Sequence, residues 1–200
     1  MKGIYILVVI IIAGCGDKCA QNYYLFKGTA QFSPEKDSVA VGDTIWFNSI
    51  IPVKNVDTGY NQVVDYSNAS NFETDIHFDP ITGTFPTGGA VDSFDFLSIT
   101  GELKKNSLDS TGSMTITYFE GPQDYQSSFA FIAKKKGIYA VTMIDIENSY
   151  EKCAKAYISM AISNSDKHQG YLSKIYFPGS PYGDSVPPIE QTHSYCFKVY

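Results

Sequence analysis

Residues 38–49 read SVAVGDTIWFNS, two short runs of alternating apolar and polar side chains on either side of Gly42-Asp43. In a β-strand, side chains two residues apart lie on the same face, so this alternation is typical of strands that bury one face in a core. Glycine and aspartate between the runs favour a turn, because glycine adopts backbone conformations that other residues avoid. The stretch therefore predicts two strands, and with them an all-β fold.

Runs of the same kind continue along the chain, separated by clusters of Gly, Pro, Asn and Asp. They lie at residues 23–32, 71–78, 93–100, 113–119, 127–133, 138–147, 155–163 and 194–200. Residues 20–163 show no helical period of useful length, so we expect one short C-terminal helix at residues 166–174 and a proline-rich loop at 177–188. Many short strands separated by turns predict an antiparallel β-sandwich.

Two segments resemble known strand pairs. VAVGDTIWF at residues 39–47 looks like the VGDTV-x-F pair of immunoglobulin-like and polycystic-kidney-disease-like domains, and FIAKKKGIYAVT at residues 131–142 is similar to their late F-x-x-x-G-x-Y-x-V-x-V pair. The resemblance implies an immunoglobulin-like sandwich. In such folds the turn glycine adopts a conformation closed to other residues, and the aromatic residue after it packs across the sandwich. The resemblance implies no chemistry, because these sandwiches have many functions.

The N-terminal end differs from the rest of the chain. A single lysine, Lys2, precedes an unbroken apolar run at residues 4–12. This run of nine residues, at about 1.5 Å each, cannot cross a hydrocarbon core of about 30 Å, so it does not predict a transmembrane helix. It has the length of the apolar segment of a signal peptide, and small residues follow it where cleavage would occur.

Ile12-Ala13-Gly14-Cys15 resembles the lipobox of bacterial lipoproteins. The resemblance implies a signal peptide at residues 1–14, a diacylglycerol on the Cys15 sulfur, and a lipid tether at residues 15–21. Residues 22–200 would then form a single β-sandwich domain, with a C-terminal extension from about residue 164. We expect the protein in the bacterial cell envelope, held at the outer membrane by its lipid. The alternative is an ordinary secretory signal that ends near a cysteine.

The composition excludes one class of partner. Charged residues make up 18% of the chain and aromatic residues 14%, which favours a folded β protein over a disordered one. The net charge is −6, arginine is absent, and the largest basic cluster is the three lysines at residues 134–136. We expect no nucleic-acid binding, because that depends on neutralising phosphates with Lys and Arg.

The cysteines predict a disulfide. With Cys15 lipidated, Cys19, Cys153 and Cys196 remain in an oxidising compartment, where disulfides persist. Three thiols allow one bridge in three ways, and the sequence leaves the choice open. We predict a Cys153–Cys196 bridge because it would join the end of the chain to its body.

Asp75, His77 and Asp79 form the most suggestive polar cluster. On a strand they would share one face, with Ile76 and Phe78 pointing inward. Two carboxylates and an imidazole on one face could bind a divalent cation, so we name these three residues as a candidate metal site. The alternative is the polar, solvated face of a half-buried strand.

No catalytic motif is present: the chain has no Gly-x-Ser-x-Gly elbow, His-Glu-x-x-His, Walker loop or Gly-x-Gly-x-x-Gly. No cofactor is expected. We therefore predict a non-enzymatic structural or binding role. The alternative is a carbohydrate-active or other hydrolytic enzyme that uses carboxylates scattered along the sequence.

The C-terminal region supplies two further hypotheses. Four aromatic residues, Tyr171, Tyr176, Phe177 and Tyr182, lie in a segment rich in Pro and Gly, which predicts a rigid loop able to bind a protein or glycan partner. Ser185 lies in an Asp-Ser-Val triplet that resembles the O-glycosylation site of some bacterial envelope proteins. The alternatives are a loop held down by its own aromatic residues and ordinary turn residues.

Overall fold

The computed structural model describes residues 22–69, 72–81, 89–106, 112–151, 154–163 and 193–200. Its strands are β1 (Asn22–Ser33), β2 (Ser38–Val39), β3 (Thr44–Pro52), β4 (Lys54–Asp57), β5 (Gln62–Asp65), β6 (Glu73–Pro80), β7 (Phe94–Thr100), β8 (Glu102–Lys105), β9 (Ser113–Thr117), β10 (Phe119–Glu120), β11 (Asp124–Ala133), β12 (Gly137–Met143), β13 (Ile146–Glu151), β14 (Ala154–Ile162) and β15 (Ser194–Val199). A short 3-10 helix, η1 (Val91–Ser93), precedes β7.

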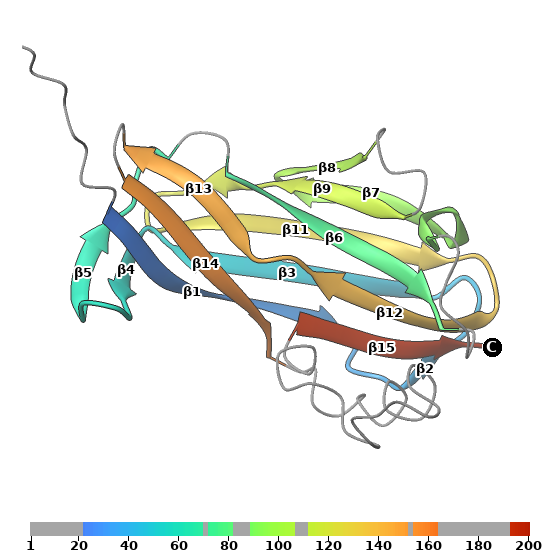
Figure 1. Ribbon diagram of the computed structural model, residues 1–200. Helices are drawn as coiled ribbons and strands as arrows, with labels where there is room; N and C mark the ends of the chain where they lie inside the picture. Colours follow the sequence, from blue (N-terminus) through green and yellow to red (C-terminus); the bar gives the residue numbers. More distant parts are fainter. Residues whose placement is uncertain (1–21, 70–71, 82–88, 107–111, 152–153, 164–192) are drawn as a thin grey trace, which may run out of the picture.

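The strands form a β-sandwich of two large sheets (Figure 1), so the predicted all-β sandwich is confirmed. The seven-stranded sheet, called sheet A, has the order β10-β11-β3-β1-β14-β13, and β7 also pairs with β11. The six-stranded sheet, called sheet B, has the order β2-β15-β12-β6-β9-β8. A separate hairpin, β4-β5, lies at the end of the sandwich where β1 begins.

The prediction that all strands run antiparallel is wrong for two pairs. β1 pairs with β14 in parallel along Asn22–Ala30, and β15 pairs with β2 in parallel. The direction of β14 follows from the chain path, because β12 crosses from sheet B to sheet A and continues as β13, whose return strand is β14. Alternation in a sequence shows which face of a strand is buried and not which way its neighbour runs.

Three of the predicted runs are divided between the sheets. The run at residues 113–119 contains β9 in sheet B and the first residue of β10 in sheet A, and the other two are longer. Residues 38–49 form β2 in sheet B and β3 in sheet A, and residues 138–147 contain most of β12 in sheet B and the start of β13 in sheet A. Both halves of these two longer runs bury one face, so the alternation continues across the change of sheet. Strands β4, β5 and β8 were not predicted, because few of their side chains are buried.

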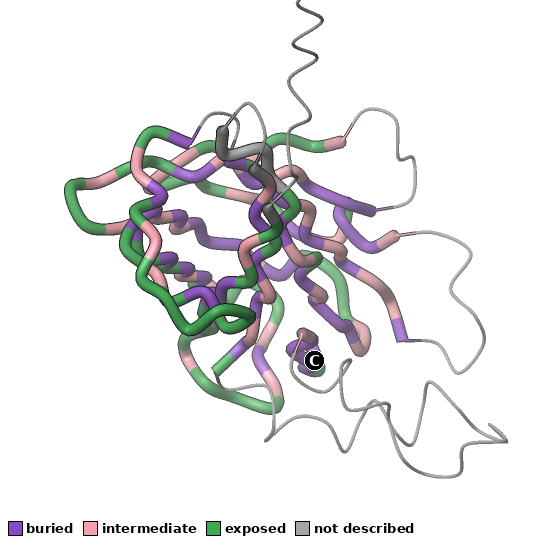
Figure 2. Tube along the Cα trace, turned by 60° about the vertical axis from the view of Figure 1, so that its left-hand side comes forward, coloured by how far each residue is buried: buried purple, intermediate pink, exposed green. Residues whose placement is uncertain are grey.

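A cluster of aromatic rings fills the space between the sheets. Figure 2 shows buried residues, in purple, along the strands of both sheets. Phe131 on β11 is fully buried, and its ring centroid lies 5.4 Å from those of Phe78 and Phe94 and 5.9 Å from that of Phe197. Phe78 and Phe197 belong to sheet B, whereas Phe94 and Phe131 belong to sheet A. These contacts therefore hold the two layers together, since aromatic rings bury large apolar areas.

Each of the two local features implied by the immunoglobulin-like resemblance is present in one of the two segments, but Gly137, the glycine before Tyr139, does not have a positive φ. Gly42 has a φ of +93°, a conformation that L-amino acids with side chains rarely adopt. Tyr139 is buried, and its ring centroid lies 4.9 Å from that of Phe94 in the opposite sheet. Gly137 is required for a different reason, because a Cβ there would lie 2.9 Å from Cζ of Tyr139.

The predicted Cys153–Cys196 bridge is wrong, because Cys196 is a free, buried thiol. Strand β15 places Cys196 opposite Ala140 in sheet B, whereas β14 begins beside Asn22 in sheet A. Figure 1 shows these two places at opposite ends of the sandwich. Cys153 itself lies outside the described residues. Burial raises the pKa of the Cys196 thiol far above its ordinary value, which makes the thiol a poor nucleophile.

The helix predicted at residues 166–174 and the loop at 177–188 lie outside the described residues. Among the residues that the structure describes, no helix is long and apolar enough to span a membrane.

Candidate binding face

The candidate metal residues lie on β6 in the middle of sheet B. As predicted, Ile76 and Phe78 are fully buried while Asp75, His77 and Asp79 share the outer face. Within the described part of the chain, however, no group of three His, Cys, Asp or Glu side chains could hold a metal ion. Residues two apart on a strand are about 6.6 Å apart, so these side chains form a row that does not converge on one point. The metal-site hypothesis is wrong.

This row belongs to the polar outer face of a half-buried strand, which was the alternative to a metal site. Thr115 on β9 donates a hydrogen bond from Oγ1 to Oδ1 of Asp75 at 2.8 Å. Thr117 donates in the same way to Oε1 of Glu73 at 3.1 Å. These cross-strand bonds stabilise the pairing of β6 with β9.

Three other predicted sites cannot be placed. Cys15, the aromatic group Tyr171, Tyr176, Phe177 and Tyr182, and Ser185 all lie outside the described residues. The site described below is made of other residues.

Asp145 is the centre of a second polar cluster. Its carboxylate accepts hydrogen bonds from the Tyr157 hydroxyl and from the Met160 backbone N–H at 2.8 Å, and its Oδ1 lies 3.0 Å from Nε2 of His193. The hydrogen bond to Asp145 raises the pKa of Tyr157, and burial adds to this effect. Because β14 lies in sheet A and His193 precedes β15 in sheet B, the cluster connects the two sheets.

The outer face of sheet A differs from that of sheet B because its centre carries no charge. Ten side chains, called the uncharged face, lie there in three cross-strand rows: Ser33, Trp46, Ala130 and Leu97; Gln31, Asn48 and Ser128; Thr29, Ile50 and Gln126. Charged residues lie at its margin, with Lys27 on β1, Asp124 on β11 and Asp95 on β7.

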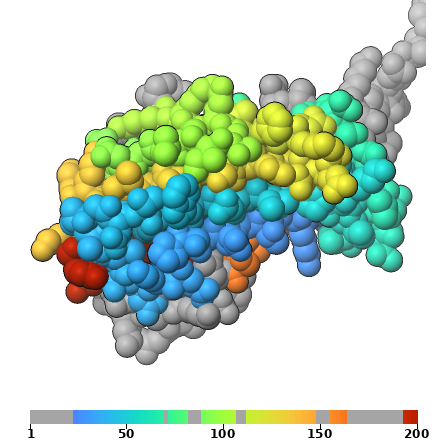
Figure 3. Space-filling model, turned by 180° about the vertical axis from the view of Figure 1, so that it is seen from behind, coloured from blue at the N-terminus to red at the C-terminus, as the bar shows by residue number. Residues whose placement is uncertain are grey.

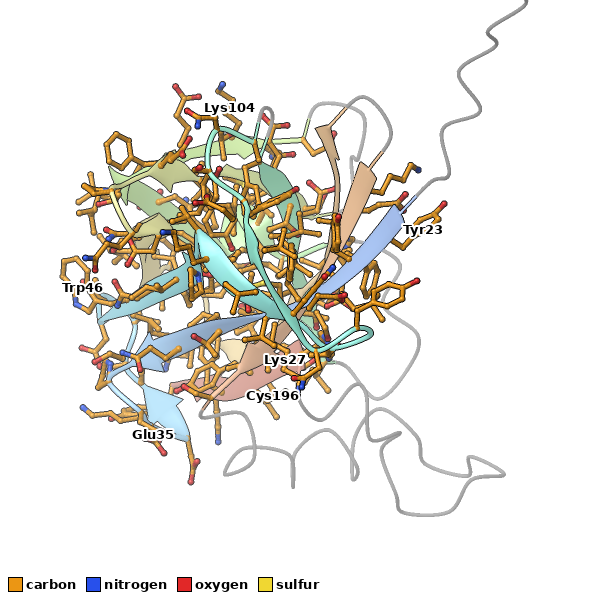
Figure 4. The ribbon with its side chains drawn as sticks, turned by 90° about the vertical axis from the view of Figure 1, so that its left-hand side faces the viewer. Tyr23, Lys27, Glu35, Trp46, Lys104 and Cys196 are labelled. Atoms are coloured by element: carbon orange, nitrogen blue, oxygen red, sulfur yellow. The ribbon has the colours of Figure 1, made fainter. Side chains whose placement is uncertain are left out.

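The alternation of β3 explains why these side chains point outward. Ile45, Phe47 and Ile51 are buried in the core, so Trp46 and Ile50 must lie on the opposite face. Trp46 remains 42% exposed and Leu97 58% exposed. Figure 3 shows β1, β3 and β11 side by side on this surface, and Figure 4 shows Trp46 pointing away from the sandwich.

A depression of about 300 Å³ lies on the uncharged face, between β1 and β3. Its lining consists of Thr29, Ala30, Gln31, Asn48, Ile50 and Ser163. All these residues are neutral, and four carry an amide or a hydroxyl group. The depression therefore offers hydrogen-bond donors and acceptors without an ion.

Hydrogen bonding positions the central amide of this face. The Ser128 hydroxyl donates to Oδ1 of Asn48 at 2.8 Å, which directs the amide nitrogen of Asn48 away from β11. Within the described part of the chain, the Asn48 amide nitrogen and the Gln31 amide make no hydrogen bond. These groups are able to bind a ligand on the face.

The sequence contains one signal for this site. Trp46 is the single tryptophan of the chain and lies between Ile45 and Phe47, two apolar residues that alternation assigns to the core. Trp46, Ile50 and Leu97 are exposed on the outer face of sheet A, and a group of exposed apolar side chains is a mark of a binding surface. The remaining members are ordinary polar residues, and only the strand register brings them together.

No protein-family model matches the chain, and no curated protein sequence matches it. Among solved structures, the human F-spondin reeler domain matches with a TM-score of 0.36 and 9% identity, covering 70% of this chain and 88% of its own. A cohesin module from a family 33 glycoside hydrolase of Clostridium perfringens matches with a TM-score of 0.32 and 8% identity, covering 68% and 98%. The second type II cohesin module of the ScaA scaffoldin of Acetivibrio cellulolyticus gives 0.31 and 15%, covering 60% and 77%. Similarities this low carry no argument about the ligand of this chain.

Proposed function

We propose that this protein is a lipid-anchored, non-enzymatic binding protein of the bacterial cell envelope, and that its uncharged face binds a neutral glycan. The observation that carries the proposal is the chemistry of that face. An exposed indole, three amide side chains and several hydroxyl groups lie together on a sheet, with charges only at the margin.

A neutral polysaccharide is the partner that suits this chemistry. Sugar rings present apolar C–H faces that stack on an indole, and their hydroxyl groups both donate and accept hydrogen bonds to amides. An acidic polymer would need cations, and the ten residues of the face include none. The depression beside Asn48 and Gln31 lies between β1 and β3. Its position suits a polysaccharide chain that lies over these two strands.

The anchor is the second part of the proposal. The lipobox at Ile12-Ala13-Gly14-Cys15 supports a lipid on Cys15 and a place at the outer membrane. An immunoglobulin-like relationship of the sandwich is also part of the proposal, supported by the turn at Gly42 and the packing of Tyr139.

Titration of the mature protein with soluble neutral polysaccharides tests the binding face. Trp46 is the single tryptophan, so its emission reports contact directly. Isothermal titration calorimetry, which needs no fluorophore, compares the variants. We expect Trp46→Ala to weaken binding about tenfold or more, corresponding to about 1.4 kcal/mol or more. Asn48→Asp should weaken it because it places a charge at the centre of the face.

The matched control is Tyr200→Ala, which removes an exposed aromatic residue at the far end of the chain and should leave binding unchanged. The proposal is overturned if no neutral polysaccharide binds, or if both variants on the face bind as the wild type does. Capture of a protein in place of a glycan would also overturn it.

Metabolic labelling with a palmitate analogue tests the anchor. The wild type should take up the label, and Cys15→Ala should remain unprocessed or be released. Absence of label from the wild type would overturn the anchor and leave the glycan-binding test unaffected.

A further inference from the structure

Exposed apolar side chains gather at the end of the sandwich where β1 begins. Five residues form this group, called the end patch: Tyr23 and Leu25 on β1, and Val56, Tyr60 and Val63 on the β4-β5 hairpin. Tyr60 and Val63 are 71% and 70% exposed, more than the other exposed large apolar residues of the described chain. Figure 3 shows the hairpin projecting at this end.

The hairpin is fixed to β1, so the end patch has a defined shape. Thr58 donates its backbone N–H to the Leu25 carbonyl at 2.8 Å, and the Asn55 side chain donates to the Lys27 carbonyl at 3.1 Å. A Cβ on Gly59 would lie 3.8 Å from Cδ1 of Leu25, which brings the tip of the hairpin beside the apolar part of β1. Val56 and Val63 are cross-strand partners and both point to the exposed face of the hairpin.

Four of the charged side chains near the end patch form two ion pairs. Nζ of Lys54 lies 3.8 Å from Oδ2 of Asp65, and Nζ of Lys155 lies 2.7 Å from Oε1 of Glu147. The tip itself, residues 58–61, reads TGYN and carries no charge. The Asp57 carboxylate is buried beneath the tip, and Lys27 lies at the edge of the patch on β1. The five side chains of the patch are apolar or aromatic, which is the composition of a surface that lies at the boundary between lipid headgroups and acyl chains.

The position of the end patch relative to the lipid tether identifies its occupant. Strand β1 begins at Asn22, seven residues after Cys15. A fully extended chain covers at most about 3.6 Å per residue, so Asn22 lies within about 25 Å of the lipidated sulfur. With the proposed anchor, the tether holds the end patch nearer to the bilayer than it holds the uncharged face.

We propose that the end patch rests on the surface of the membrane, with Tyr60 and Val63 inserted at the level of the headgroups. The inference rests on the lipid anchor of the proposed function and is independent of its glycan-binding face. Lipid contact at the patch fixes the orientation of the sandwich on the bilayer. Figure 4 shows Tyr23 and Trp46 on different sides of the molecule, so this orientation leaves the uncharged face accessible.

The test uses the full mature chain, lipidated and reconstituted in vesicles of zwitterionic phospholipids with brominated acyl chains, which quench tryptophan at the bilayer. In a Trp46→Phe background, Tyr60→Trp should give an emission that these lipids quench several-fold. The matched control is Val41→Trp in the same background. Val41 is similarly exposed but lies beside Tyr200, at the other end of the sandwich, so its emission should not be quenched.

Quenching at position 60 should persist from low salt to about 0.5 M, because the five side chains that contact the lipid carry no charge whose attraction screening would weaken. Equal quenching at positions 41 and 60, or none at 60 in a chain that floats with the vesicles, overturns the inference alone. A chain that carries no acyl group and does not float overturns both the inference and the anchor.

Discussion

Replacement of Asp57 should destabilise the protein more than its position in a small hairpin suggests. Its side chain is completely buried and accepts three backbone hydrogen bonds: from Leu25 at 2.8 Å and Gly59 at 3.1 Å to Oδ1, and from Tyr60 at 3.1 Å to Oδ2. The carboxylate thereby ties the hairpin tip to β1. The perturbation to test is Asp57→Ala, with Asp57→Asn as an intermediate case.

The expected magnitudes follow from these bonds. A hydrogen bond to a charged acceptor contributes about 1.5–3 kcal/mol, and donors that water can reach recover part of that. Gly59 and Tyr60 are at the exposed tip, whereas the Leu25 N–H lies beneath it. We expect Asp57→Ala to lower the free energy of unfolding by about 3 kcal/mol. In Asp57→Asn the amide oxygen can replace Oδ1, but the amide nitrogen opposes the Tyr60 N–H, so we expect a loss of about 1–2 kcal/mol.

Urea unfolding at neutral pH, followed by Trp46 fluorescence, measures both changes. With a slope near 2 kcal/mol per molar urea, Asp57→Ala should lower the midpoint by about 1.5 M. Gln62→Ala is the matched control: Gln62 pairs with Asp57 across the same hairpin, is exposed, and should leave the midpoint unchanged. A midpoint for Asp57→Ala within about 0.2 M of the wild type would refute the reasoning.

Three further outcomes are expected. Phe131→Ala removes the ring that contacts both sheets and should lower the free energy of unfolding by about 3–5 kcal/mol in the same assay; a loss below about 1 kcal/mol would contradict the account of the core. Burial raises the pKa of Tyr118 above its ordinary value, although a hydrogen bond with Ser49 opposes this. The contribution of this protonated hydroxyl to stability is complete below about pH 10, where the unfolded chain starts to lose the proton. Above that pH the contribution declines by up to about 1.4 kcal/mol per pH unit. The free energy of unfolding of Tyr118→Phe should therefore fall less steeply with pH above about pH 10 than that of the wild type, and an equal slope would contradict this expectation. Cys196 should resist iodoacetamide at pH 8 in the native protein and react after unfolding in urea, whereas a disulfide at Cys196 in non-reducing peptide maps would contradict the free thiol.

Alternation in the sequence predicted which side chains are buried. On β3 and β6, the apolar residues at every second position are those found in the core. The same pattern could not show that β2 and β3 belong to different sheets, or that β1 and β14 are parallel. Those features depend on where the chain turns and which strand arrives beside it, and such contacts are distant in sequence.

The candidate sites, too, could be predicted only in part from the sequence. The three polar residues of β6 were correctly placed on one face, but sharing a face does not bring side chains to one point. The predicted Cys153–Cys196 bridge is wrong because Cys196 is a free thiol buried in sheet B, and the sequence does not show which cysteines the strand order brings together. The uncharged face was missed because its members come from four strands, and only their register makes Asn48 a neighbour of both Gln31 and Ser128.

The position of β1 inside sheet A has a mechanical consequence. Under the proposed anchor, tension on the tether pulls on Asn22 along the strand axis. Strand β1 is held on one edge by β14 from Asn22 to Ala30 and on the other by β3 from Thr29 to Ser33. The backbone bonds on both edges are then loaded together in shear, whereas an edge strand would be peeled away one bond at a time. Force on a polysaccharide bound at β1 and β3 would be transmitted to the membrane through β1, the strand that follows the tether. The packing between the two sheets would carry none of this force.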